Sequence, residues 1–213
     1  ERMRSCHFAY FMEYGLRARP RETAAFDAPQ IGTFLHFLLE NVTRDVLAEG
    51  GFAAVEQEEL HRLVRRYTER YVEQELHNFQ NRNARFRYLF ARLRTTAYAV
   101  IDQVAAELRC SDFVPMAFEL SFGGKNGALS AVTISEPDGE LRVGGKVDRV
   151  DGWLHDGRLY LRVVDYKSGR KSFDLANVRM GLDIQMLLYL FTLQKEGARY
   201  FGQEIEPAGV LYL

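Results

Sequence analysis

Two short stretches of this sequence place charged side chains directly after runs of apolar residues. Residues 145–151 read GKVDRVD and residues 163–169 read VVDYKSG, with sixteen residues between Asp148 and Asp165. Carboxylate oxygens are hard ligands that suit Mg²⁺ or Mn²⁺, and a lysine such as Lys167 can steady negative charge that develops on a phosphate. A cation held in this way also lowers the pKa of a bound water. These residue types therefore favour the hydrolysis of a phosphodiester.

The spacing also predicts how strands would bring these side chains together. Successive side chains of a strand alternate between its two faces, so Asp165 and Lys167 should point one way and Tyr166 the other. If the strands that carry Asp148 and Asp165 pair through the Asp-Gly turn at residues 156–157, the two carboxylates share one face. Taken alone, each of these charged residues is also explained as an ordinary solvent-exposed side chain at the end of a strand. Their combination indicates a metal site, because burying an unpaired charge is costly unless something uses it.

Two further side chains are candidates for the same site. A predicted helix carries a narrow polar stripe that consists of Thr33, His36, Glu40 and Thr43. Neutral imidazole is a common metal ligand, although a lone histidine on such a helix is often structural. Glu119 falls on the strand that precedes the two metal-binding strands, where it is either an accessory carboxylate or a solvent-facing charge.

These side chains need elements that position them, and the apolar pattern predicts helices first and strands later. Helices are expected where apolar residues recur every three or four positions, at residues 6–16, 31–47, 55–79 and 85–108. A β-meander is expected where apolar residues alternate or run together, at residues 117–122, 128–134, 141–151 and 159–164. A last helix should span about residues 177–195, and a last strand should begin near Ala208. This order predicts one α/β domain, helical over about residues 1–112 with a catalytic core over about residues 113–213.

The composition fits one globular domain and gives no global electrostatic signal. With 213 residues and 47% hydrophobic content, the chain can bury one good core. Its formal net charge of -1 means that nucleic-acid contact must come from local patches. No apolar run approaches the ~18 residues of a membrane span, and Cys6 and Cys110 are too far apart in sequence for a self-contained metal or disulfide motif. We expect a cytoplasmic protein, and a fragment of a longer one, since the chain starts without methionine and stops in an apolar run.

One helical stretch carries a local basic pattern. Residues 76–101 contain no acidic side chain but several arginines among aromatic residues. Guanidinium and aromatic groups together suit a nucleic-acid groove. In helical projection, arginines flank the apolar stripe as the pairs Arg85/Arg92 and Arg87/Arg94. Arginines at such positions also simply cover a core with their aliphatic stems, and both interpretations stay open.

The ordered motifs resemble those of the PD-(D/E)XK nuclease superfamily, in its RecB branch. The matching segments are residues 5–16, 32–40, 145–151 and 164–169, together with Gln185 and Tyr189. The two N-terminal segments make the chain most similar to the C-terminal nuclease domain of AddB-like helicase/exonuclease subunits. The resemblance covers nearly the whole chain. It implies a restriction-endonuclease-like core, in which a mixed central sheet is flanked by helices, with an N-terminal helical region.

The resemblance also implies roles for individual residues. The metal ligands, for Mg²⁺ or Mn²⁺, would be His36, Asp148 and Asp165. The catalytic residues would be Asp148, Asp165 and Lys167. An acidic residue is common in this family at the position of Glu119, which makes it a candidate accessory residue.

Two remaining family features concern substrate and a second cofactor. Gln185 and Tyr189 would line the substrate groove, although four-residue spacing on an ordinary helix explains them as well. Cys6 matches the first of four cysteines that ligate a 4Fe-4S cluster in the full-length proteins, whose other three come from a C-terminal group that this sequence lacks. We therefore expect the cluster in a full-length parent and not in this chain.

The implied activity is that of a Mg²⁺-dependent deoxyribonuclease. It would be an exonuclease that hydrolyses phosphodiester bonds during double-strand-break processing and recombinational repair in the bacterial cytoplasm. DNA and an AddA-like helicase/nuclease subunit would be its partners. One alternative is a free-standing RecB-like exonuclease of the CRISPR-associated type. Another is a catalytically silent DNA-binding or scaffolding module, against which the intact set of Asp148, Asp165 and Lys167 argues.

Overall fold

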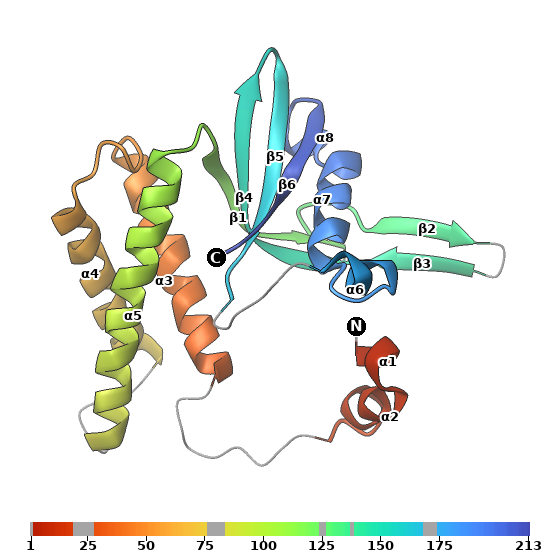
Figure 1. Cartoon of the computed structure of the whole chain (residues 1–213), viewed down its shortest axis with the longest axis horizontal. Helices are drawn as coiled ribbons and strands as arrows, with labels where there is room; N and C mark the ends of the chain where they lie inside the picture. The colour runs from red at the N-terminus through yellow and green to blue at the C-terminus, as the bar shows by residue number, and fades with distance from the viewer. Residues whose placement is uncertain (1, 19–27, 76–83, 124–126, 137–138, 168–173) are drawn as a thin grey trace.

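Three long helices form a layer on one side of the molecule (Figure 1). The computed structural model describes residues 2–18, 28–75, 84–123, 127–136, 139–167 and 174–213. The three helices are α3 (Ala28–Ala48), α4 (Gln57–Glu75) and α5 (Ala84–Arg109). They pack because each has apolar side chains at three- and four-residue spacing. On α5 the buried members of this set are Phe90, Leu93, Ala97, Ile101, Val104 and Leu108.

A mixed four-stranded sheet stands beside the helical layer. Its order is β1-β4-β5-β6, with β1 (Val114–Phe122), β4 (Gly145–His155), β5 (Arg158–Asp165) and β6 (Ile205–Tyr212). β4 is antiparallel to both β1 and β5, whereas β5 and β6 are parallel. The expected fold class, a mixed central sheet flanked by helices, is confirmed.

The sheet is covered on both faces. Val164 and Tyr166 belong to the core cluster of the helical layer. The alternate residue Val163 belongs to a second cluster with Met186 and Leu190 of α7 (Gln185–Glu196). α6 (Leu175–Arg179) and α8 (Ala198–Phe201) flank α7 in the chain. None of the helices within the described ranges is long and apolar enough to cross a membrane.

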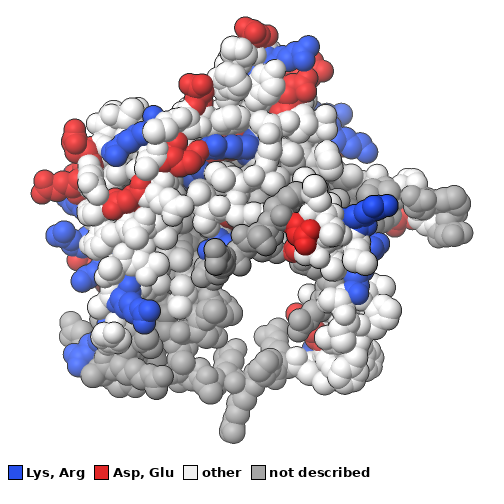
Figure 2. Space-filling view, in the orientation of Figure 1, with Lys and Arg blue, Asp and Glu red and all other residues white. Residues whose placement is uncertain are grey.

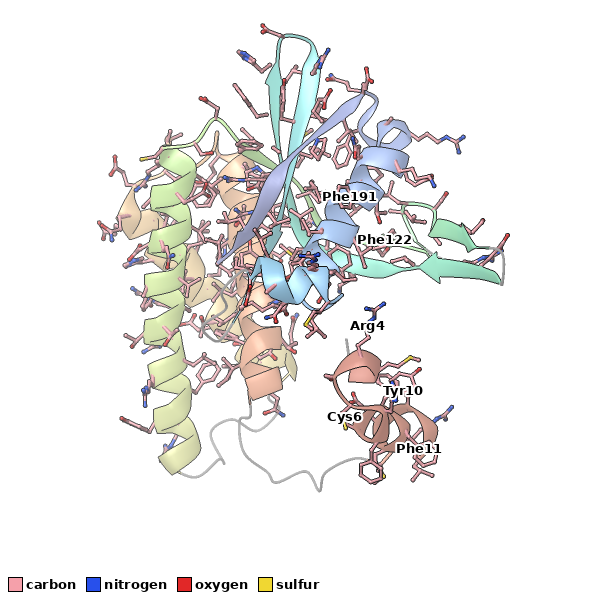
Figure 3. The ribbon with its side chains drawn as sticks, turned by 45° about the vertical axis from the view of Figure 1, so that its right-hand side comes forward. Arg4, Cys6, Tyr10, Phe11, Phe122 and Phe191 are labelled. Carbon is pink, nitrogen blue, oxygen red and sulfur yellow. The ribbon has the colours of Figure 1, made fainter. Side chains whose placement is uncertain are left out.

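The helix expected at residues 6–16 is present over residues 7–15, but its second half is π-helical. It consists of α2 (His7–Tyr10) and the π-helical turn η1 (Phe11–Gly15), and a separate short helix, α1 (Arg2–Ser5), precedes it. α1 and α2 are separated at Cys6, whose backbone is extended. The Cys6 Sγ accepts a hydrogen bond from the Ala9 amide at 3.4 Å. Arg4 reaches from α1 toward the rest of the chain and donates to the Met180 carbonyl at 2.9 Å (Figure 3).

The predicted β-meander is wrong, because strands pair out of sequence order. β2 (Val132–Glu136) and β3 (Gly139–Val143) form a separate two-stranded ribbon, and β1 pairs across this insertion with β4. The single strand expected at residues 141–151 is therefore two strands, β3 and β4, that separate at Gly144.

The helix expected at residues 177–195 is likewise two helices, α6 and α7. Between them Gly181 and Asp183 have φ values of 75° and 53°, which a right-handed helix does not allow. The helices expected at residues 31–47 and 85–108 are confirmed as α3 and α5. The helix expected at residues 55–79 is α4, and residues 76–79 lie outside the described part of the chain.

Candidate metal centre

A break in the side-chain alternation of β1 turns the carboxylate of Glu119 toward α3. Glu119 of β1 and Asp148 of β4 lie between the paired positions Phe118–Arg149 and Leu120–Val147. The φ of 51° at Glu119 is in the left-handed region that residues other than glycine rarely adopt. Phe118, its neighbour, also faces α3, with the Arg44 guanidinium 4.7 Å from its ring centroid. Two consecutive side chains therefore point to the same helix, which regular β structure does not permit.

The carboxylates of Glu119 and Asp148 meet His36 of α3. His36 Nδ1 lies 3.5 Å from Asp148 Oδ1 and 3.8 Å from Glu119 Oε1. One ligand atom from each of the three residues lies within 4.8 Å of the others. They line a cleft of about 700 Å³, to which Glu40 and Lys146 also contribute. Among the described residues, this group has the composition and spacing to hold a metal ion.

Tyr166 fixes the orientation of His36 through its backbone. His36 Nε2 is 3.2 Å from the Tyr166 carbonyl oxygen, so this nitrogen carries the proton and donates. In the neutral imidazole the opposite nitrogen, Nδ1, would be left with a lone pair directed at the cleft. Metal-binding histidines are commonly oriented by such a hydrogen bond from the other ring nitrogen. The Tyr166 amide also donates to Asp148 Oδ2 at 3.0 Å, so the backbone of one residue holds two candidate ligands.

The electrostatics of the cluster favour an added cation. Interaction with the Glu119 carboxylate raises the pKa of His36, and the same contact lowers the pKa of Glu119. Lys146 pairs with Glu119 and lowers its pKa further. Burial raises the pKa of Asp148, the Tyr166 amide and His36 partly oppose this rise, and the charges of Asp165 and Glu119 add to it. Negative charge is thus crowded in a half-buried space, where a divalent ion would offset it.

Asp165 and Lys167 lie beside this cluster at the end of β5. As predicted, β4 and β5 pair through the turn at residues 156–157, with His155 opposite Arg158. Asp165 is only 6% exposed, and its Oδ2 lies 2.8 Å from Lys167 Nζ. Within the described residues, Asp165 contacts Lys167 and is not part of the group formed by His36, Glu119 and Asp148. Its role as a ligand and the role of Lys167 stay predictions.

Gln185 and Tyr189 share one face of α7, as their spacing predicts. Gln185 Nε2 donates to the Tyr189 hydroxyl at 2.8 Å, and the Tyr189 ring packs edge-on against Phe122. A Cβ at Gly145 would stand 2.7 Å from Tyr189 Cε1, so the ring lies directly on the start of β4. This places Tyr189 near the strand that carries Asp148. A role for both residues in a substrate groove stays a prediction.

A buried charge network behind the site was missed by sequence reasoning. Arg149 and Asp151 are both 0% exposed, with Arg149 Nε 2.7 Å from Asp151 Oδ1. Arg162 Nη2 bridges Asp151 Oδ2 at 2.8 Å and Glu107 Oε1 of α5 at 2.7 Å. The available signal was the two-residue spacing of Arg149 and Asp151 within an apolar strand. The network ties the sheet to α5.

This network also reaches the metal-centre residues. Arg149 Nη1 donates to the Tyr166 hydroxyl at 3.1 Å. Although burial lowers the pKa of Arg149, Tyr166 and Asp151 raise it above its usual value. Burial raises the pKa of Tyr166 to about 12, which keeps its hydroxyl protonated. The ring is held from behind while its backbone contacts His36 and Asp148, so the network supports the geometry of the site.

The two cysteines lead to a first prediction. Cys6 and Cys110 are both exposed and free, on α2's N-terminal boundary and just beyond α5. The purified chain should be colourless, without the broad visible absorbance of iron-sulfur charge transfer, because one or two thiolates cannot supply the usual four ligands. Absorbance spectra and iron analysis under anaerobic conditions provide the measurement. A brown protein with stoichiometric iron would contradict the expectation that Cys6 lacks its partners here.

Comparison with known proteins adds an independent observation. A sequence profile of the PD-(D/E)XK nuclease superfamily matches residues 1–213. Three curated proteins, each named as a subunit of an ATP-dependent helicase/deoxyribonuclease, match the entire chain. They come from Clostridium tetani (29% identical), Exiguobacterium sibiricum (32%) and Acetivibrio thermocellus (32%). The chain covers 18% of the first two and 19% of the third, so it spans about a fifth of the length of these relatives.

Proposed function

The chain belongs to the PD-(D/E)XK nuclease superfamily, and on that premise we propose that it is a divalent-metal-dependent deoxyribonuclease domain. The observation that carries the proposal is the convergence of His36, Glu119 and Asp148 from a helix and two strands. A group of this kind beside a buried aspartate and a lysine suits phosphodiester hydrolysis. The hydrogen bond from His36 Nε2 to the Tyr166 carbonyl, which directs Nδ1 toward the carboxylates, distinguishes this group from an ordinary exposed acidic cluster.

The donor set fits Mg²⁺ or Mn²⁺. His36 would offer Nδ1, and Asp148 and Asp165 would offer carboxylate oxygens, with Glu119 as an accessory ligand. Asp165 Oδ2 is buried and has no hydrogen bond of good geometry, so the ion pair with Lys167 leaves it able to serve a cation. A bound cation would supply Lewis acidity toward the phosphate and its attacking water.

The other residues of the site would bind and orient the substrate. The Lys167 ammonium, 38% exposed beside Asp165, would steady charge on the phosphate in the transition state. Gln185 and Tyr189 would line the path of the strand that carries the scissile bond. Lys146, which now pairs with Glu119 at the cleft, adds a second ammonium at its mouth.

The names of the relatives extend the proposal to the parent protein. They are described as helicase/deoxyribonuclease subunits, so we infer that this chain acts as the nuclease domain of such a subunit. It would digest DNA ends as an exonuclease during double-strand-break repair, with an AddA-like partner subunit in the bacterial cytoplasm. A 4Fe-4S cluster that includes Cys6 belongs to the same proposal and would require cysteines from elsewhere in the parent.

A metal titration tests the function directly. The chain should cleave end-labelled DNA when Mg²⁺ or Mn²⁺ is added, and excess EDTA should stop the reaction. The substitution His36→Ala should weaken Mn²⁺ binding by roughly tenfold or more, because it removes a direct ligand. Mn²⁺ binding is measured by the loss of its free electron paramagnetic resonance signal.

A matched control separates this effect from a general loss of histidine. His61 is 33% exposed, close to the 30% of His36, and its Nε2 pairs with Asp102 between α4 and α5. His61→Ala should leave Mn²⁺ binding unchanged. Equal Mn²⁺ affinity of His36→Ala and the wild type would remove His36 from the metal centre. A wild type that binds no metal would instead favour the catalytically silent module.

A further inference from the structure

One exposed face of α5 leads to Lys167. Gln103 lines a small cavity of about 50 Å³ together with Lys167 and His36. From Gln103 toward the N-terminus of α5, the same face contains four more exposed residues at spacings of four, three, four and four: Ala99, Thr96, Arg92 and Tyr88. At 100° per residue these positions share one side of the helix. We call this set, Tyr88 to Gln103, the α5 track.

The α5 track has the composition of a surface for a single nucleic-acid strand. Tyr88 is 67% exposed, so its ring is available for stacking. Arg92 is exposed one turn away, and no hydrogen bond or ion pair within the described residues engages its guanidinium. By contrast, Arg62 and Arg66 on α4 are paired with Glu59 and Asp45. An arginine that has no partner among the described residues, beside an exposed aromatic ring, suits a phosphate and an unstacked base.

The distribution of charge around the α5 track agrees with a polyanionic ligand. No acidic residue occurs between residues 76 and 101. Figure 2 shows Lys and Arg side chains over the lower part of the helical layer, which includes the N-terminal half of α5, while Asp and Glu gather toward its upper end. A negatively charged strand would therefore be attracted to the half of α5 that carries Arg92.

We propose that the α5 track guides a single DNA strand to the metal centre, with Tyr88 stacking on a base and Arg92 contacting a phosphate. The inference rests on the proposed nuclease function and adds the route of its substrate. A duplex does not fit equally well, because paired bases offer no free face to Tyr88. At 1.5 Å per residue, Tyr88 and Gln103 are about 22 Å apart. At the 3.4 Å per nucleotide of a stacked strand, the track spans roughly six nucleotides.

The test compares two arginines of one helix. Arg92 lies on the α5 track, whereas Arg94, also exposed, projects 200° around the helix, on the other side. Binding of a fluorescent twenty-nucleotide oligothymidine is measured by anisotropy without divalent metal, over a range of salt concentrations. Arg92→Ala should reduce the slope of log K against log salt by about 0.7, the value for one phosphate contact on a single strand. Arg94→Ala should leave the slope unchanged.

Tyr88→Ala gives an independent measurement on the same surface. It should weaken oligothymidine binding by roughly 5- to 150-fold, the range for the loss of one base-aromatic stack. The salt slope should stay as in the wild type, since a ring carries no charge. In cleavage assays of the same oligonucleotide with Mg²⁺, the loss from Arg92→Ala should lie in KM rather than kcat. Thermal melting of each variant verifies that it is folded.

The outcomes separate the track from the nuclease proposal. Hydrolysis of thymidine 5′-monophosphate p-nitrophenyl ester by the wild type depends on the metal centre alone, since this substrate is too short to reach Arg92. If the ester is hydrolysed but Arg92→Ala and Arg94→Ala behave alike, or the wild type does not bind oligothymidine, the track is overturned. The exposed face of α5 would then be assigned to a protein partner. Failure to hydrolyse the ester with any divalent metal would contradict the nuclease function itself.

Discussion

The substitution Asp165→Asn should abolish Mg²⁺-dependent DNA cleavage while the chain stays folded. An amide keeps the shape of the side chain but is a poor ligand for Mg²⁺, so several kcal/mol of transition-state stabilisation are lost. This corresponds to a decrease in rate of roughly a thousandfold or more. Asp165 is buried, yet its partner Lys167 is 38% exposed and can turn to water when the carboxylate is neutralised. The stability should therefore change little compared with the activity.

Cleavage of end-labelled DNA and thermal melting by circular dichroism measure the two effects separately. Asp156→Asn is the matched control, because Asp156 is an aspartate 87% exposed in the turn between β4 and β5. Its φ of 48° suits asparagine, so that variant should be fully active and folded. If folded Asp165→Asn cuts DNA as well as the control does, Asp165 has no part in the metal centre.

The second large effect is expected on stability, from Asp151→Ala. Asp151 is 0% exposed and neutralises both Arg149 and Arg162. Removing the carboxylate leaves buried guanidinium groups short of a partner, which costs about 3–5 kcal/mol of the free energy of unfolding when one member of a buried pair is lost. Urea denaturation at neutral pH, followed by circular dichroism, measures the difference. The slope of the transition should be unchanged if the native state keeps its compactness.

An exposed ion pair of the same sheet provides the control. Arg158 Nη1 and Glu206 Oε1 are 3.0 Å apart at the strand edge, where solvent screens the pair. Glu206→Ala should change the stability by about 1 kcal/mol or less. If Asp151→Ala is no more destabilising than Glu206→Ala, the buried charge network does not stabilise the packing of the sheet against α5.

The sequence by itself determined the elements whose pattern is local. Periodic apolar residues located α3 and α5 with almost the observed bounds, because a helix buries one side at a fixed spacing. The Asp-Gly turn correctly paired β4 with β5, since a short turn leaves neighbouring strands no other partner. Alternation along β5 is seen in Val164 and Tyr166, which lie in the core of the helical layer, and in Val163, which lies in the core on the other face. Residue types and order alone were also enough to indicate the family.

Only the tertiary structure decided how the candidate ligands meet. The partner of β1 is β4, across the inserted ribbon of β2 and β3, and no local pattern states which strand lies next to which. Regular alternation would send Phe118 and Glu119 to opposite faces, yet the φ of 51° at Glu119 brings both toward α3. Such a conformation is held against its local cost by the packing around it. The juxtaposition of Glu119 with His36 is therefore a property of the assembled fold, because the free energy that stabilises it comes from contacts distant in the sequence.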